Sequence, residues 1–211
     1  MNLLTNAPLD KAALGVSFEF GMQLPVLGAG QSIKHLYLHW SATGYFGSFY
    51  EYNAVISLRI TDKAWICNVV TGPRLNATEP PQSGYAEHTY QRNGNAFGIC
   101  VDSMTNATPS NFGESPITLE EIETLCACSA VVCLKYGIDS ADPKLVMTHG
   151  EAAILDGYFI LDQTLDGVTR WDLARLTASD IPITKQEAVE NGNKLRARIH
   201  EYKLNLMAQK L

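Results

Sequence analysis

Hydrophobic and polar residues alternate between residues 33 and 40 with the period of a β-strand. One face of this predicted strand is polar or aromatic and the other is apolar (His35, Tyr37 and His39 against Leu36, Leu38 and Trp40). Small and polar residues follow from Ser41 onward. The pattern therefore predicts a strand that ends next to His39 and brings this side chain to a loop.

Further strands are predicted by β-rich runs along the chain. The runs 52–58 and 64–70 flank a turn at 61–63 and predict a hairpin, and another run spans 96–101. Residues 71–95 are punctuated by glycine and proline, so we expect them to form a long surface loop. Functional residues often lie on loops of this kind.

Two capping boxes mark the starts of helices. Thr118 and Glu121 open the first helix, which has apolar residues at helical spacing and should end at Gly137. Thr184 and Glu187 open a second, long helix near the carboxy terminus. Strands and helices therefore alternate along the chain.

This alternation predicts the fold class α/β, with a single domain built on a central mixed β-sheet that helices flank. The chain has 211 residues, of which 46% are hydrophobic, so it can bury one sizeable core. We expect residues 1–183 to form this domain, with an irregular lead-in at 1–30. Residues 184–211 should form an amphipathic carboxy-terminal helix.

Composition narrows the function classes. The net charge is −6 and the pI is about 5.3, which argues against a nucleic-acid-binding protein with a broad basic face. No stretch approaches the ~18 consecutive apolar residues of a transmembrane helix, and no secretory signal is visible, so we expect a cytoplasmic location on synthesis. The five cysteines are odd in number and form no C-x-x-C motif, which favours buried free thiols.

Two histidines and a carboxylate occupy positions suited to a metal site. His39 ends the first strand, a later apolar run ends in His149, and Asp172 lies on a loop. Such a set is typical of an open, catalytic zinc site, in which water takes the fourth position. We expect the remaining strand and helix histidines, His35 and His200, to be structural or surface residues.

Four short motifs follow one another in order (His39-Trp40-Ser41-Ala42-Thr43, Tyr52-Asn53-Ala54-Val55-Ile56, His88 with Asn93 and Gly98-Ile99, and Thr148-His149-Gly150-Glu151). In this order they resemble the zinc-dependent N-acetylmuramoyl-L-alanine amidases, a family that includes phage lysozyme-type amidases and peptidoglycan recognition proteins. The resemblance covers residues 33–176. It implies an amidase-like fold and one zinc ion per chain.

The resemblance assigns two zinc ligands to His39 and His149. The third ligand of that family is an Asp or Cys, with a Lys two residues before it and Pro-Gly after it. Asp172 is the nearest match, with Arg170 in place of the Lys and Leu173-Ala174 in place of Pro-Gly. Other nearby aspartates stay alternatives for the third ligand (Asp156, Asp162 and Asp166).

The resemblance also suggests residues that act on the substrate. Some members carry a glutamate where this chain has Cys100, so we expect the version that uses a tyrosine, here Tyr52. Arg170 could hydrogen-bond an oxyanion, although it could not shuttle a proton. Three acids stay alternatives (Glu51, Asp102 and Glu151). We expect substrate contacts from His88, Asn93 and Thr43.

The function implied is hydrolysis of the amide bond between N-acetylmuramic acid and L-alanine in peptidoglycan. The bacteriolytic endolysin of a phage is one context, and a cytosolic enzyme of muropeptide recycling is the alternative. A non-catalytic peptidoglycan-binding module and a secreted antibacterial effector are further alternatives. The expected partner is peptidoglycan or a muropeptide, and the sequence does not indicate an oligomeric state.

The segment 184–211 differs in charge from the rest of the chain. It holds six basic and three acidic residues, a net charge of +3, so the rest carries −9. Apolar residues at helical spacing form a stripe along it (Leu195, Ile199, Tyr202 and Leu206). We expect the stripe to dock on the domain with the basic residues facing out. The alternative is a basic amphipathic helix that contacts an anionic envelope or wall.

Overall fold

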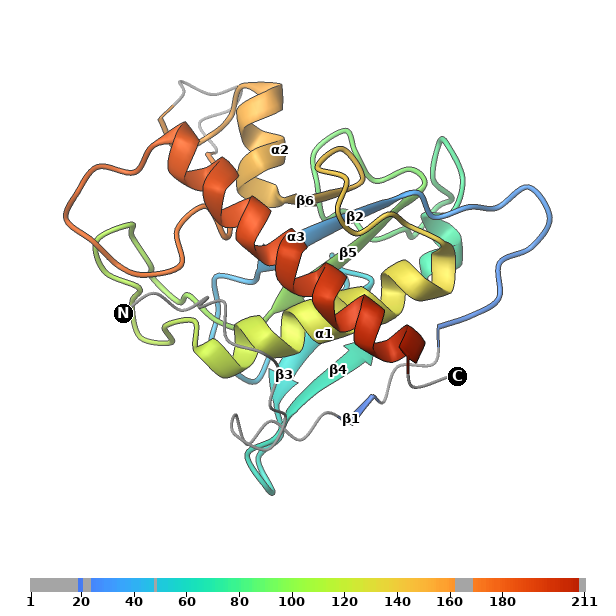
Figure 1. Ribbon diagram of the computed structural model, residues 1–211, viewed down its shortest axis with the longest axis horizontal. Coiled ribbons are helices and arrows are strands. Elements are labelled where there is room, and N and C mark those ends of the chain that lie inside the picture. Colours follow the sequence, from blue (N-terminus) through green and yellow to red (C-terminus); the bar gives the residue numbers. More distant parts are fainter. Residues whose placement is uncertain (1–18, 21–23, 48, 162–168, 209–211) are drawn as a thin grey trace.

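A mixed six-stranded β-sheet runs through the part of the protein that the computed structural model describes, namely residues 19–20, 24–47, 49–161 and 169–208 (Figure 1). The strands are β1 (Glu19–Phe20), β2 (His35–Trp40), β3 (Ala54–Leu58), β4 (Trp65–Val69), β5 (Ala96–Val101) and β6 (Val146–Thr148). Their order in the sheet is β1-β4-β3-β5-β2-β6. Neighbouring strands are parallel except for β3 and β4, which form the predicted antiparallel hairpin.

Strand β1 lies inside residues 1–30, which we expected to be irregular throughout. It pairs in parallel with β4, with Glu19 opposite Ile66. Without this pairing β4 would present the unpaired backbone groups of an edge strand, which readily accept a further strand. Residues 1–18 and 21–23 of the lead-in lie outside the described residues.

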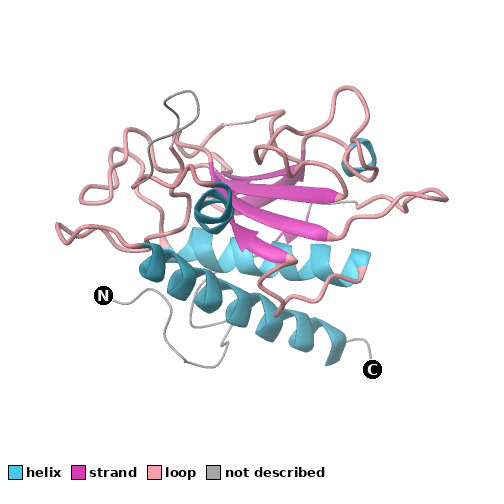
Figure 2. Cartoon of the chain, turned by 90° about the horizontal axis from the view of Figure 1, so that it is seen from above, coloured by secondary structure: helices cyan, strands magenta, loops and turns pink. Residues whose placement is uncertain are grey.

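The helices are α1 (Leu119–Tyr136), α2 (His149–Asp156) and α3 (Lys185–Ala208), and a short 3-10 helix, η1 (Pro73–Leu75), lies in the long loop. Helices α1 and α3 cover one face of the sheet, whereas loops cover the other (Figure 2). The predicted fold class is therefore confirmed: a single α/β domain with a central mixed sheet flanked by helices. Among the described helices, none is long and apolar enough to cross a membrane.

Both ends of α1 follow the signals in the sequence. The Thr118 hydroxyl accepts a hydrogen bond from the Glu121 backbone N–H, and the Glu121 carboxylate accepts one from the Thr118 N–H. Gly137 ends the helix in the left-handed conformation, with φ 71°. The predicted capping box and C-terminal glycine are both confirmed.

The two faces of the sheet bury different amounts of apolar surface. The apolar residues of β2 join a large cluster that includes α1 and α3. The opposite face holds a small cluster (Tyr37, Ala96, Met147 and Ala152). His39 lies on this second face and is completely buried. All five cysteines are free and buried, as expected.

Helix α3 packs along α1 and buries the predicted stripe through Leu195, Ile199 and Tyr202. The expectation that its basic residues face out is wrong for two arginines. Arg198 pairs with Glu123 of α1 at 2.8 Å, and Arg196 is 3% exposed and pairs with a carboxylate of α2. A buried carboxylate needs such a partner, which draws the arginines inward. Lys210 lies outside the described residues.

Candidate metal centre

The two candidate histidines lie at the carboxyl ends of adjacent parallel strands. His39 is the second-last residue of β2, and His149 follows β6, the neighbour of β2. The expectation that His149 ends a strand is wrong in detail, because it is the first residue of α2. Thr148 and Glu151 form a complete capping box there, and this box starts the helix.

Asp172 reaches the histidines from a later loop. The Gly150 N–H donates to the Asp172 carbonyl oxygen at 3.0 Å. A Cβ atom on Gly150 would lie 2.9 Å from the Cβ of Ala174 and 3.1 Å from the Asp172 carbonyl oxygen. Only glycine therefore allows the first turn of α2 to approach this loop so closely.

The three side chains meet in a triangle of ligand atoms. Nδ1 of His39 lies 3.1 Å from Nδ1 of His149 and 3.5 Å from Oδ2 of Asp172. The distance from His149 Nδ1 to the same oxygen is 3.2 Å. In a tetrahedral zinc site with ligand bonds of about 2.0–2.1 Å, neighbouring ligand atoms lie about 3.3 Å apart. The triangle therefore has the size that a tetrahedral metal ion requires.

Charge and burial also suit a cation. Burial, the largest effect, together with His149, lowers the pKa of His39 to about 4, so its ring is neutral at neutral pH. Burial alone would raise the pKa of Asp172, but the two histidines hold it well below its usual range. Oδ1 of Asp172 is buried without a partner among the described residues. This buried group of two imidazole nitrogens and one carboxylate could bind a metal ion.

The other aspartates do not complete this triangle in the described part of the chain. Asp156 forms a bidentate ion pair with Arg92, with both N–O distances at 2.6 Å. Asp162 and Asp166 lie outside the described residues. His35 contacts the Lys144 carbonyl oxygen and His200 contacts Ser140, so neither reaches the site.

Helix α3 supports the segment that carries His149. The guanidinium of Arg196 donates to both oxygens of Glu151, at 2.7 and 2.8 Å, and to the Val146 carbonyl oxygen at 2.9 Å. Glu151 was an alternative catalytic acid, but its carboxylate is engaged by the capping box and by this ion pair. It therefore fixes the start of α2, two residues from the candidate ligand His149.

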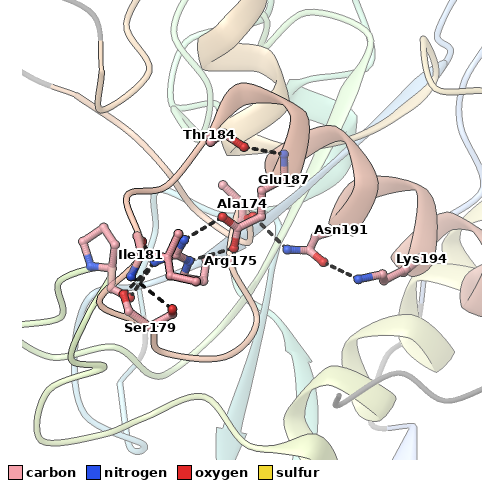
Figure 3. Close-up of polar contacts among 9 residues, drawn as sticks. Ala174, Arg175, Ser179, Ile181, Thr184, Glu187, Asn191 and Lys194 are labelled. Atoms are coloured by element: carbon pink, nitrogen blue, oxygen red, sulfur yellow. Dashed lines mark hydrogen bonds and ion pairs between the residues drawn. The ribbon is translucent and has the colours of Figure 1, made fainter. Parts of the chain in front are cut away.

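Helix α3 also supports the loop that carries Asp172 (Figure 3). Arg175 donates to both oxygens of Glu187 at 2.6 and 2.7 Å, and Asn191 donates to the Ala174 carbonyl oxygen at 2.9 Å. The predicted capping box at Thr184 forms only in part: its hydroxyl accepts from the Glu187 N–H, while the Glu187 carboxylate binds Arg175 instead. A charged partner outweighs the neutral backbone N–H for that carboxylate.

Two cavities open beside the candidate metal ligands. One has a volume of about 600 Å³ and the other about 380 Å³, and both are lined by His88, His149 and Arg170. The larger is formed mainly by the loop 71–95. The loop in which we expected functional residues therefore forms one wall of the cavity that reaches the candidate ligands.

Tyr52 and Arg170 both lie next to the triangle. Tyr52 was expected on a strand but precedes β3, in a turn. Its ring centroid is 5.2 Å from that of His39. Burial, with Cys100 and Asp172 adding to it, raises the pKa of Tyr52 above its usual range. Arg170 is exposed and lines both cavities.

The expected substrate contacts separate into two groups. His88 and Asn93 line the larger cavity, and the Asn93 side chain also accepts from the Thr89 N–H at 2.8 Å. Thr43 lines neither cavity, and its hydroxyl pairs with Ser41 at 2.7 Å. This contact joins two residues of the turn that follows β2, and the expected substrate contact of Thr43 stays a prediction.

The structure also shows where two of the alternative acids lie. Glu51 lines the smaller cavity. Asp102 is completely buried, and burial raises its pKa to about 6.

Sequence reasoning missed Thr89, whose hydroxyl lies 3.3 Å from Nε2 of His39. Its position next to His88 was the one available signal.

Comparisons of the chain with protein-family models, with curated proteins and with solved structures found no match.

Proposed function

We propose that the protein is a zinc-dependent amidase that cleaves the bond between N-acetylmuramic acid and L-alanine in peptidoglycan. The observation that carries this proposal is the buried triangle of His39, His149 and Asp172, whose edges of 3.1 to 3.5 Å fit tetrahedral zinc. Harder ions such as Mg²⁺ prefer octahedral oxygen ligands, so a set with two imidazoles favours zinc.

When bound there, a zinc ion would polarise the scissile carbonyl and lower the pKa of a water to about 7. Tyr52 keeps its phenolic proton because burial raises its pKa, so it serves as a hydrogen-bond donor to the oxygen that gains negative charge. Arg170 adds a permanent positive charge at the edge of both cavities. The burial of the three ligands keeps bulk water from weakening these interactions.

The choice of substrate rests on the resemblance of the four motifs to muramoyl-L-alanine amidases. The site supports it through its form: a cavity of about 600 Å³, partly polar, adjoins the ligands and can receive a glycopeptide segment. A phage endolysin and a muropeptide-recycling enzyme would share this site. Activity on intact sacculi favours the first, and activity restricted to soluble muropeptides favours the second.

Product analysis on purified sacculi tests the proposal. The zinc-loaded protein should release new amino-terminal L-alanine without new reducing sugar ends, whereas His39→Ala should release neither. Glu114→Gln, a change at a surface hydrogen bond to Asn106, serves as a matched control that should keep full activity. Reducing ends without new amino-terminal L-alanine would indicate a glycosidase and contradict the proposal. Tight binding of muropeptides without any product would instead indicate a peptidoglycan-binding module.

A further inference from the structure

A single hydroxyl group connects the candidate metal ligand His39 to the cavity histidine His88. Thr89 Oγ1 lies 3.3 Å from Nε2 of His39 and 2.9 Å from Nδ1 of His88. All three side chains are buried, with at most 4% of any of them exposed. No other side-chain partner of this hydroxyl is found among the described residues. The hydroxyl has one proton to donate, so the two contacts constrain each other.

Metal binding at His39 determines which group donates the proton in each of the two hydrogen bonds of Thr89. The triangle uses Nδ1 of His39, so this nitrogen must offer its lone pair, and the proton of the neutral ring must sit on Nε2. His39 Nε2–H then donates to Thr89 Oγ1. Metal-bound histidines generally donate their second ring N–H to a partner of this kind.

The second contact follows from the first. Because Thr89 Oγ1 accepts from His39, its own proton is free for His88, the remaining neighbour at 2.9 Å. If His88 Nδ1 donated instead, the hydroxyl proton would have no acceptor in a buried place, which is unfavourable. His88 Nδ1 is therefore the acceptor, and the proton of this ring sits on Nε2.

We propose that Thr89 is a positioning residue that couples the metal ligand His39 to His88 and fixes His88 as an Nε2–H hydrogen-bond donor. Nε2 of His88 is the ring nitrogen that has no partner among the described residues. The ring lines both cavities, so an oxygen acceptor of a bound substrate, such as an amide carbonyl or a carboxylate, can complete it. This role in substrate binding rests on the proposed function.

The surrounding backbone holds the side chains of His88 and Thr89 in place. A Cβ atom on Gly98 would lie 2.2 Å from the His88 ring, so glycine at this position of β5 lets the ring lie directly on the strand. The Thr89 N–H donates to the Asn93 side chain at 2.8 Å, which fixes the backbone that carries the hydroxyl. These contacts hold the His88 ring against β5 and the Thr89 backbone beside Asn93.

Nuclear magnetic resonance of the imidazole nitrogens tests the proposal directly, because the chain has only five histidines. In the zinc-loaded protein, His88 should be a single Nε2–H tautomer, with His88→Gln identifying its signals. Thr89→Val should abolish this preference, and Thr89→Ser should retain it. An Nδ1–H tautomer in the zinc-loaded protein, or an unchanged tautomer in Thr89→Val, would overturn the proposal.

Zinc affinity gives a second readout. Loss of a partner behind a metal-bound histidine typically lowers metal affinity about 10- to 100-fold, so Thr89→Val should show this loss and Thr89→Ser should not. Thr124→Val removes an equally buried threonine hydroxyl from α1, far from the site in sequence, and should leave zinc affinity unchanged. Equal affinities in Thr89→Val and Thr124→Val would contradict the proposal.

The two proposals can fail separately. If the tautomer and the zinc affinity behave as expected but no muramoyl-L-alanine bond is cleaved, the amidase assignment fails and the role of Thr89 stands. If the bond is cleaved while His88 carries its proton on Nδ1, the amidase assignment stands and the role of Thr89 fails.

Discussion

The two faces of the sheet differ in the size of the apolar cluster that covers them and in the polar atoms that they bury. On the helical face, α1 and α3 close over one large apolar cluster, and Arg198 pairs with Glu123. The loop face holds a small apolar cluster, and buried polar atoms without partners among the described residues lie around the candidate metal centre, among them His88 Nε2 and Asp172 Oδ1. The helical face buries the larger apolar cluster, whereas polar groups around the candidate metal centre are left for a ligand.

The faces are nevertheless connected through α3. This helix buries an apolar stripe on the helical face, and it also sends Arg196 to the start of α2 and binds the loop of Asp172 through Glu187 and Asn191. The stable half of the molecule therefore holds two of the three candidate ligands in position. The predictions below test how far the two faces can be separated.

The largest effect is expected from removal of residues 184–211. This change uncovers the apolar surface that Leu195, Ile199 and Tyr202 cover, and it leaves Glu151 and Glu123 without their arginines. We expect loss of cooperative thermal unfolding, measured by circular dichroism. A truncated domain that stays folded and cleaves soluble muropeptides, but binds anionic vesicles less well than the full chain, would favour the alternative of an envelope-contacting helix.

Arg196→Met should destabilise the protein and also weaken metal binding. Removing one member of a buried ion pair typically costs about 3–5 kcal/mol in the free energy of unfolding. Because Glu151 would lose its partner at the start of α2, zinc affinity should fall as well. Arg198→Met breaks the matched pair on the helical face and should lower stability alone. Equal zinc affinities in the two variants would show that the faces are independent.

Tyr52→Phe and Arg170→Ala should act on the loop face only. Loss of one donor to a developing oxyanion typically costs about 2.7–4 kcal/mol in the activation barrier, roughly a hundred- to thousand-fold in kcat. Both variants should keep zinc and the wild-type melting temperature, which elemental analysis and calorimetry would verify. Wild-type kcat in either variant would remove that residue from the proposed mechanism.

Local signals in the sequence were sufficient for much of this architecture. The alternation in β2, the capping box at Thr118 and the glycine at 137 each involve neighbours within a few residues, and each predicted its element correctly. His39, His149 and Asp172 were also found from such local patterns. Their assembly into one buried triangle agrees with the hypothesis of a metal site.

The rest depends on contacts between distant residues. Helix α2 was missed because the apolar run before His149 suggested a strand end, although Thr148 and Glu151 have the spacing of a capping box. No local pattern shows that Glu151 meets Arg196, which lies 45 residues later. The contact of Thr89 with His39, across 50 residues, also arises only from the parallel arrangement of the sheet and its loops.

A smaller effect concerns the pH dependence of the stability. Burial raises the pKa of Glu121 from 4.5 to about 8, so the folded protein binds this proton more tightly than the unfolded chain. The resulting stabilisation is complete below pH 4.5 and is lost as the pH rises to about 8. Glu121→Gln keeps an acceptor for the capping box and should flatten the decline in melting temperature over this range. A parallel decline in variant and wild type would contradict this assignment.

Zinc stoichiometry of matched aspartate variants tests the central claim most directly. Purified wild-type protein, Asp172→Ala, Asp156→Ala, Asp162→Ala and Asp166→Ala would be compared by elemental analysis after equilibration with zinc. The account predicts one zinc per chain in every protein except Asp172→Ala, which should lose both zinc and amidase activity. Full zinc and full activity in Asp172→Ala, with both lost in another variant, would contradict it.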